Sequence, residues 1–307
     1  MKWLIYGILS AILFGLWGLF DKLSAFQNPV ISNVMVYLAA LLFSFTVVII
    51  ANRRIRFSGY GLVAGIFGGT TNFLLLNALL NNYLILVMPF VSAASVVFFL
   101  IIYLTERPKY SARQKALAAT GMMLCVSGLF LVSVGSVGIS DFMKEFSLDS
   151  VYVLVSIAIM FSVSLWTYFT YKSVQRDRTD AFTYNFWNIL SSFTLSVILL
   201  MIIDPGIFPG MLSLDRLGYI YPSLSGIAVA AGSIFTFMAF GGTTTKTKLQ
   251  EIMVAIIANG DVIPLLFFSY FILGEWVTEG FIGVIIVLAG LFTIHYAEAC
   301  TVPYSRS

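Results

Sequence analysis

The sequence predicts an all-α membrane protein with ten transmembrane helices, arranged as two inverted five-helix repeats with both termini on the cytoplasmic side. Three observations lead to this prediction. Of the 307 residues, 60% are hydrophobic and only 10% are charged, and the mean hydropathy is +0.97. The apolar residues form long runs, and Lys and Arg gather in every second gap between these runs. A soluble domain of this size does not have such a composition.

Each apolar run is long enough to cross a bilayer as a helix. A hydrocarbon core of about 30 Å needs about 20 apolar residues in a helix, and a backbone in lipid must satisfy its own hydrogen bonds. The runs lack the alternation that is typical of barrel strands. The expected spans are residues 3–20, 31–51, 59–80, 83–104, 115–134, 150–172, 181–203, 218–241, 251–273 and 280–297.

The distribution of basic residues tests this number of spans. With the N-terminus inside, all but three of the 17 Lys and Arg residues fall in cytoplasmic segments, the exceptions being Lys22, Lys144 and Arg216. The positive-inside rule predicts such a bias, and a miscounted span would scramble it in every later segment. The first span follows Met1 and Lys2 directly and has no cleavage region, so we expect a retained signal anchor in the cell membrane.

A weak internal repeat relates the two halves of the chain. Residues 121–132 of the fifth span align with residues 283–294 of the tenth, with two glycines and the Leu-Phe that follows them in register. The third and eighth spans each hold a Tyr followed by Gly-Ile at the same spacing. A unit of five spans is odd, so its second copy must enter the membrane from the other side. We therefore expect inverted repeats at residues 1–140 and 141–307; chance recurrence of packing glycines is the alternative.

Two acidic residues close equivalent spans. Glu106 follows Thr105 at the end of the fourth span and Glu275 follows Gly274 at the end of the ninth, each before an apolar helix with spaced glycines. Together with ten spans in two halves, these features resemble the EamA-like branch of the drug/metabolite transporter superfamily over nearly the whole chain. The resemblance implies a secondary transporter of small organic solutes, with a central cavity lined mainly by the first, third and fourth helices of each half. It does not imply which solute.

Asp261 is the strongest candidate for a functional residue. It lies near the middle of the ninth span, where a carboxylate costs about 2.5–3.5 kcal/mol to insert, so it should face the protein interior or water. Pro264 cannot donate to the carbonyl of Gly260, so the helix should kink there and this carbonyl needs another partner. With Asn259 beside it, the kink suits a proton, a cation or a substrate ammonium group. A protonated Asp261 with a purely structural role is the alternative.

Other polar and aromatic residues within the spans are weaker candidates for substrate binding, namely Asn259, Asn72, Asn77, Asn188, Trp17 and Trp166. Asn72 and Asn77 follow a ladder of four glycines at positions 61–69, which favours close helix packing. Tyr184, Asn188 and Ser191 recur at helical spacing, so their stripe would either face the transport path or hold two helices together. The two tryptophans would stack on a ligand or act as interfacial anchors.

Several absences narrow the function. Away from their ends the expected spans hold no Lys or Arg, so highly anionic substrates are disfavoured. The first span, which we expect to end before Asp21, holds no carboxylate, so Asp261 would have to carry any coupling proton. The loops hold no P-loop, metal-ligand cluster or nucleophile set, which argues against ATP-driven transport, a metal site or a cofactor. The net charge of +3 follows from topology and gives no support for nucleic-acid binding, and Cys125 and Cys300 offer no extracellular disulfide pair.

These observations predict a carrier, with no enzymatic activity, that moves small neutral or zwitterionic metabolites by alternating access about Asp261. Amino acids are the leading substrate class. Its partners would be the solute, protons or another coupling ion, and the lipid bilayer; the direction of transport and the oligomeric state, a homodimer included, are open. The alternatives are a sugar or polyol uptake carrier, and a non-transporting scaffold or membrane enzyme. An enzyme would need a second catalytic group at the depth of Asp261, and the expected spans offer none.

Overall fold

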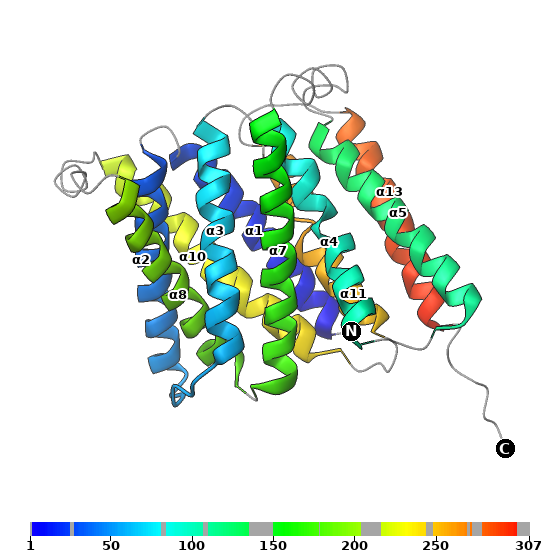
Figure 1. Cartoon of the computed structure of the whole chain (residues 1–307), viewed down its shortest axis with the longest axis horizontal. Coiled ribbons are helices and arrows are strands. Elements are labelled where there is room, and N and C mark those ends of the chain that lie inside the picture. The colour runs from blue at the N-terminus through cyan, green and yellow to red at the C-terminus, as the bar shows by residue number, and fades with distance from the viewer. Residues whose placement is uncertain are drawn as a thin grey trace.

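The computed structural model describes residues 2–24, 28–80, 84–106, 110–134, 150–177, 179–203, 216–243, 248–268, 271 and 278–299. Within these ranges the chain is helical and contains no strand. The helices lie side by side as a bundle (Figure 1). They are α1 (Lys2–Ser24), α2 (Pro29–Ile50), α3 (Gly59–Leu80), α4 (Leu84–Glu106), α5 (Ala112–Val134), α7 (Ser150–Arg176), α8 (Ala181–Ile203), α10 (Arg216–Gly241), α11 (Leu249–Ala258), α12 (Val262–Phe268) and α13 (Thr278–Ala299).

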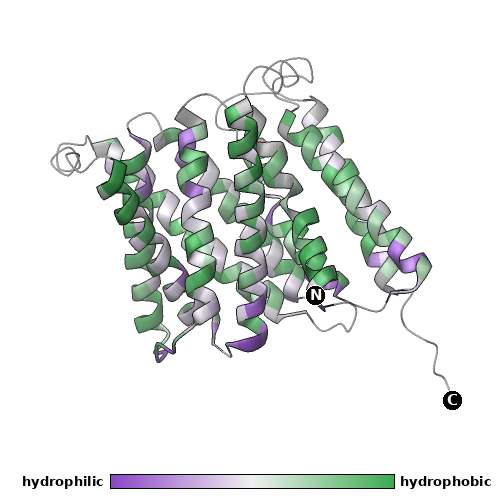
Figure 2. Cartoon of the chain, viewed as in Figure 1, coloured by the Kyte–Doolittle hydropathy of each residue, from purple (hydrophilic) through white to green (hydrophobic). Residues whose placement is uncertain are grey.

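Eight helices in the described part of the chain are long and apolar enough to cross a membrane, namely α1, α2, α3, α5, α7, α8, α10 and α13. Of the two other expected spans, α4 contributes a shorter apolar segment, Ala93–Glu106, and the ninth includes both α11 and α12. Apolar residues cover the helices along most of their length (Figure 2). Large apolar side chains such as Ile50 and Phe292 remain 79% and 71% exposed, as expected for surfaces that contact lipid. The predicted class, an all-helical membrane protein, is confirmed.

Polar residues fix where two of the helices begin. The side chain of Asn28 accepts hydrogen bonds from the backbone N–H groups of Val30 and Ile31 at 2.9 and 3.3 Å, and Pro29 occupies the first position of α2. Asp180 caps α8 in the same way. These caps pair N–H groups that a helix cannot satisfy by itself, and they place the start of each helix at the beginning of an apolar run.

Glycines of α3 allow α8 to approach at backbone distance. A Cβ atom placed on Gly65 would lie 1.9 Å from the carbonyl oxygen of Asn188, and one on Gly69 would lie 3.3 Å from that of Ser192. The contact advances by one helical turn on both helices together, so α3 and α8 run parallel. The expectation that this glycine ladder serves helix packing is confirmed, because no larger residue fits between the two backbones.

The same type of contact recurs between α10 and α2. A Cβ atom on Gly226 would lie 2.1 Å from the carbonyl oxygen of Val36 and 2.9 Å from the backbone nitrogen of Ala40. Gly65 and Gly226 belong to the Tyr and Gly-Ile pattern that the third and eighth expected spans share. Each of them therefore seats its helix on the backbone of a neighbour from the other half of the sequence.

Glycines also join α5 and α13, which lie together at one edge of the bundle (Figure 1). A Cβ atom on Gly128 would lie 2.6 Å from the carbonyl oxygen of Gly283, and one on Gly121 would lie 2.8 Å from that of Gly290. The contact moves forward on one helix as it moves backward on the other, so the two helices run antiparallel. The segments that the repeat aligns are thus packed directly against each other.

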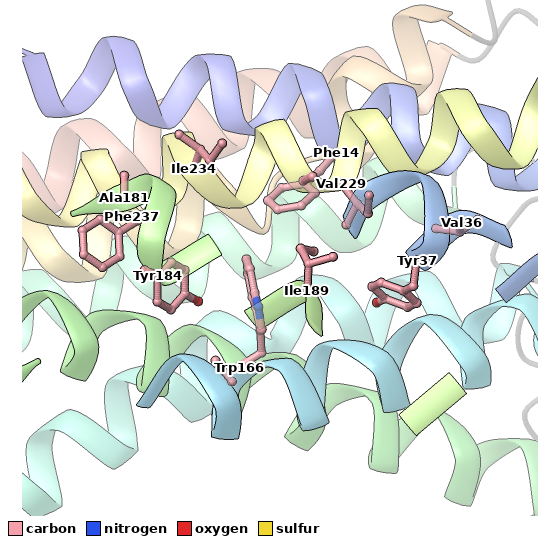
Figure 3. Close-up of a cluster of buried hydrophobic side chains, with 13 residues drawn as sticks. Phe14, Val36, Tyr37, Trp166, Ala181, Tyr184, Ile189, Val229, Ile234 and Phe237 are labelled. Atoms are coloured by element: carbon pink, nitrogen blue, oxygen red, sulfur yellow. The ribbon is translucent and has the colours of Figure 1, made fainter. Parts of the chain in front are cut away.

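Among the described residues, the buried apolar cluster with the most members lies where α1, α2, α3, α7, α8 and α10 meet. Figure 3 shows Phe14, Tyr37, Trp166, Tyr184 and Phe237 within it, contributed by α1, α2, α7, α8 and α10 in that order. The ring of Tyr184 stacks on that of Phe237 with centroids 4.8 Å apart. This cluster fixes the helices that surround the candidate site.

Candidate functional site

The ninth expected span is interrupted inside the bundle. Helix α11 ends at Ala258, residues Asn259, Gly260 and Asp261 form a turn, and α12 begins at Val262. The kink expected from the sequence is therefore present, as a complete break between two helices. An interrupted helix places backbone ends and side chains away from regular helical positions, which membrane proteins tolerate where protein or water surrounds them.

The carbonyl of Gly260 finds its replacement partner within the turn. Pro264 has no N–H to offer, and the N–H of Ile263 donates to the Gly260 oxygen at 3.0 Å instead. The N–H of Leu265 donates to the carbonyl oxygen of Asp261, also at 3.0 Å. We expected this carbonyl to need another partner, and that partner is the backbone N–H of Ile263. Because the Gly260 carbonyl is already paired, the side chains must provide the chemistry of the site.

Helices α1 and α4 pack against the break. A Cβ atom on Gly15 of α1 would lie 2.8 Å from Cβ of Pro264 and 3.1 Å from the carbonyl oxygen of Asp261. From the other side, the amide of Asn259 donates to Ser95 Oγ of α4 at 3.4 Å. Asn259 is buried and Asp261 is partly exposed. The first helix thus packs against the backbone of the break, and the fourth helix contacts the side chain of Asn259.

Asn72 belongs to a chain of hydrogen bonds between three helices. Its amide donates to Asn33 Oδ1 of α2 at 2.7 Å, and the amide of Asn33 donates to Ser196 Oγ of α8 at 2.8 Å. All three side chains are buried. Asn77 lies further along α3 and is partly buried. We predicted Asn72 from the sequence but not its partner Asn33. A polar Asn among the first apolar residues of the second span could have identified Asn33 as a candidate.

The polar stripe on α8 faces α3. The backbone carbonyl oxygen of Asn188 lies against Gly65, as described above. The hydroxyl of Ser191 donates a hydrogen bond to the backbone carbonyl oxygen of Leu62 at 2.6 Å. The hydroxyl of Tyr184 lies 2.5 Å from Thr170 Oγ1 of α7. For Tyr184 and Ser191, these contacts favour holding helices together over facing the transport path. Asn188 makes its contact with α3 through the backbone, so its side-chain role stays a prediction.

Trp17 and Trp166 both contact Phe14. The ring of Phe14 meets that of Trp17 at 5.8 Å and that of Trp166 at 5.6 Å, edge to face in both cases. Figure 3 shows Phe14 and Trp166 among the buried side chains of the central cluster. Gly68 of α3 also packs against the indole of Trp166. The structure thus brings together the two tryptophans, one from α1 and one from α7, around Phe14; Trp166 is buried and Trp17 is partly buried.

Two of the candidate residues carry a buried polar atom without a hydrogen-bond partner among the described residues. These atoms are Asn72 Oδ1 and Asn188 Oδ1. Buried polar atoms are nearly always paired, with protein, water or a ligand. The two asparagines therefore retain hydrogen-bonding capacity that no described residue uses.

The prediction that the first span holds no carboxylate was wrong, because Asp21 lies within α1. We expected the first span to end before this residue and to hold no carboxylate, but α1 continues to Ser24 and the Asp21 side chain is 2% exposed. The hydroxyl of Ser225 on α10 donates to its carboxyl oxygen. The end of a helix cannot be located from hydropathy alone when the next residues are polar but buried by a neighbouring helix.

An ionic cluster lies at the other end of the bundle, around Glu106 at the end of α4. The ammonium group of Lys172 on α7 forms an ion pair with one carboxylate oxygen, and that of Lys248 lies 3.8 Å from the other. Lys248 also donates to the hydroxyl of Tyr171 at 2.7 Å and lies 3.8 Å from Glu251. The side chains of Lys172 and Glu106 are only 9% and 19% exposed.

This cluster joins the fourth helix to segments from the second half of the sequence. Lys248 precedes α11 and has a φ angle of 63°, a left-handed conformation that is uncommon for residues other than glycine.

Burial and the nearby Glu251 carboxylate raise the pKa of the Tyr110 hydroxyl, which lies between α4 and α5. The sequence singled out one acidic residue at the end of the fourth span and one at the end of the ninth. Glu106 takes part in this cluster. Glu275 lies outside the described residues, and so do Cys300 and the expected boundary between the two repeats at residues 140 and 141.

The fold and the buried polar residues together define an all-helical membrane protein with an interrupted helix in its interior. A crystal structure of a protein shares this fold, with a TM-score of 0.68 and 11% sequence identity, and the match covers 95% of this chain and 97% of that chain. At this identity the likeness extends to the fold alone. No protein-family model matches the sequence, and no curated protein matches it significantly.

Proposed function

We propose that this protein is a secondary transporter that moves small neutral or zwitterionic metabolites across the cell membrane by alternating access, with amino acids as the leading class. The observation that carries the proposal is the break between α11 and α12, where Asn259 and Asp261 lie between α1 and α4. Helices interrupted inside a membrane bundle are typical of substrate and ion sites in secondary transporters.

The pairwise packing of the helices supports an inverted repeat. We assign α1 to α5 to the first copy and α7, α8, α10, α11 with α12, and α13 to the second. Exchanging the copies converts the α3–α8 pair into α10–α2, the α1–α10 pair into α7–α3, and the α4–α7 pair into α11–α1 and α12–α1. Each of these pairs is in contact. The pairs α2–α8 and α5–α13 are converted into themselves, and the antiparallel glycine contact of α5 and α13 is the orientation that an inverted repeat requires.

The roles of the candidate residues follow from their positions in this proposed arrangement. Asp261 would bind the coupling proton or the substrate ammonium group, and Asn259 would orient the substrate. The unpaired polar atoms of Asn72 and Asn188 support a polar substrate, because a ligand or water would complete their hydrogen bonding. The resemblance of the sequence to EamA-like drug/metabolite transporters supports the same function.

The ionic cluster around Glu106 supports a conformation that is closed at the end that the sequence places in the cytoplasm. Its ion pairs connect α4 of the first copy with α7 and Lys248 of the second. Opening this end would require the two copies to separate there, which would break these contacts. Alternating access therefore predicts that the cluster forms in one state and is absent in the other.

Uptake into proteoliposomes tests the proposal. Radiolabelled amino acids are offered to vesicles with and without an imposed pH gradient, and wild type is compared with Asp261→Asn. We expect the wild type to accumulate at least one amino acid in response to the gradient, and the variant to lose this accumulation while it still exchanges substrate. Asp180→Asn is the matched control, because an Asn caps α8 as well as an Asp does.

Three outcomes would contradict parts of the proposal. Unchanged gradient-driven flux in Asp261→Asn would remove this residue from coupling. Uptake that sugars inhibit and amino acids do not would favour the sugar or polyol carrier. Absence of flux for every solute class offered, with correctly folded protein in the vesicles, would contradict transport itself.

A further inference from the structure

Asp21 is a buried carboxyl group that the interrupted-helix site does not use. It lies on α1, and its side chain is 2% exposed. Its hydrogen-bond donor is the hydroxyl of Ser225 on α10, which is itself fully buried. A carboxyl in this position is enclosed by protein, although it lies within a helix that is apolar enough to cross a membrane.

No positive charge neutralises this carboxyl within the described part of the chain. Its described contacts are with Ser225 and with Trp17, one turn earlier on α1, and none is an ion pair. The titratable group from a neighbouring helix that interacts with it electrostatically is the hydroxyl of Tyr37 on α2. An unpaired carboxylate is costly to bury, and in practice such a group becomes neutral instead.

The burial of Asp21 decides which ligand can neutralise it. A metal ion or an ammonium group needs space for its own volume and several oxygen partners, whereas a side chain with 2% exposure leaves no opening beside it. A proton needs no additional space and converts the carboxylate into a neutral acid. Intramembrane carboxyl groups commonly serve as proton relays in pumps and transporters.

Helix α1 connects Asp21 with the interrupted helix. Gly15 packs against the Asp261 carbonyl oxygen and Pro264, and Asp21 lies six positions further along the same helix, about 9 Å away at 1.5 Å per residue. A movement of α1 against α10 that follows a change at the break would therefore also move Asp21 relative to Ser225. One helix thus both contacts the break and carries Asp21.

We propose that Asp21 is a proton-binding site, in which a proton from water on one face of the membrane converts the buried carboxylate to the neutral acid and is released when α1 and α10 separate. Its role in coupling rests on the transporter function proposed above. The binding of the proton itself does not, because it depends only on the burial of the carboxyl group.

Infrared difference spectroscopy on the purified full chain in lipid tests this proposal without any substrate. Spectra recorded between acidic and alkaline pH contain a C=O stretching band for each buried carboxyl that titrates. We expect one such band to disappear in Asp21→Asn and to persist in Asp261→Asn. In Ser225→Ala the carboxyl remains, and we expect its band to persist at a shifted frequency because the hydroxyl no longer contacts it.

Two results would overturn the proposal. One is an Asp21→Asn spectrum that retains every carboxyl band of the wild type. The other is an unshifted set of bands in Ser225→Ala, which keeps the test decisive if Asp21→Asn does not fold. Because these spectra need no transported solute, failure of the uptake experiment would leave the band assignment intact, and the two proposals fail separately.

Discussion

The amide of Asn33 on α2 donates to Ser196 Oγ on α8 at 2.8 Å, and the amide of Asn185 on α8 donates to Ser44 Oγ on α2 at 2.7 Å. Each Asn precedes a Ser of its own helix at the same spacing in the sequence. If the two helices are exchanged, Asn33 takes the place of Asn185 and Ser44 that of Ser196, so each hydrogen bond corresponds to the other. The pair ties the antiparallel helices α2 and α8 together at two points through buried side chains.

Replacing the two asparagines should have unequal effects. Asn185→Ala removes one interhelical hydrogen bond, for which we expect a loss of about 1 kcal/mol in the free energy of unfolding. Asn33→Ala also removes the acceptor of Asn72 and leaves that buried amide unpaired, so we expect about twice that loss. Denaturation of the purified protein in detergent measures both. Thr46→Ala, which removes an exposed hydroxyl that bonds only within its own helix, should change little; equal losses for the two asparagines would contradict the hydrogen-bond chain.

Adding a methyl group to Gly65 or Gly226 should strongly destabilise the protein. In each case the new Cβ would overlap a backbone oxygen of the facing helix, and no side-chain rotation can relieve such a clash. We expect each Ala variant to lose about 1–3 kcal/mol. Gly18→Ala is the matched control, because its Cβ would lie 3.6 Å from a flexible Leu265 side chain, and Ala favours the helix by up to about 1 kcal/mol. Wild-type stability in either test variant would show that the helices are further apart.

Neutralising Glu106 should destabilise the ionic cluster. Glu106→Gln leaves the ammonium group of Lys172, whose side chain is 9% exposed, without its carboxylate, and we expect a loss of about 2–3 kcal/mol in the free energy of unfolding. The double variant Glu106→Gln with Lys172→Met should recover part of this loss, because no unpaired charge remains. Arg113→Gln, at an exposed position, is the control. A double variant as unstable as the sum of the single variants would indicate that the two residues act independently.

The proposed topology predicts which positions a membrane-impermeant thiol reagent can reach. In a background without Cys125 and Cys300, we expect Arg54→Cys to react only after the membrane is permeabilised, because its loop is assigned to the cytoplasm. Leu217→Cys, at the expected outer end of α10 and 51% exposed, should react in intact cells. The reverse pattern would invert the orientation, and reaction of both positions from outside would contradict the number of spans.

Much of the fold could be predicted because lipid imposes simple rules on the chain. Apolar runs must become helices, so the positions of α1, α2, α5 and α8 follow from hydropathy. Pro264 predicted a kink where the structure has the break, because a residue without an N–H disrupts a helix wherever it occurs. The glycine ladder of α3 predicted close packing because small residues have few other uses inside a membrane protein.

The partners of these residues depended on tertiary structure. Composition makes Asn33 and Asn72 equally plausible as cavity residues, and only the arrangement of α2, α3 and α8 pairs them with each other. The sequence placed Asp21 outside the membrane because it follows an apolar run, while the structure buries it against Ser225.

By itself, then, the sequence determined the helical membrane class, the approximate positions of the eight long apolar helices and the position of the kink in the ninth expected span, since each follows from local interactions. Only the tertiary structure decided which polar groups are paired, which are left with unused hydrogen-bonding capacity, and where a carboxyl is enclosed. These depend on the register between helices that are distant in the sequence, and hydropathy carries no information about that register.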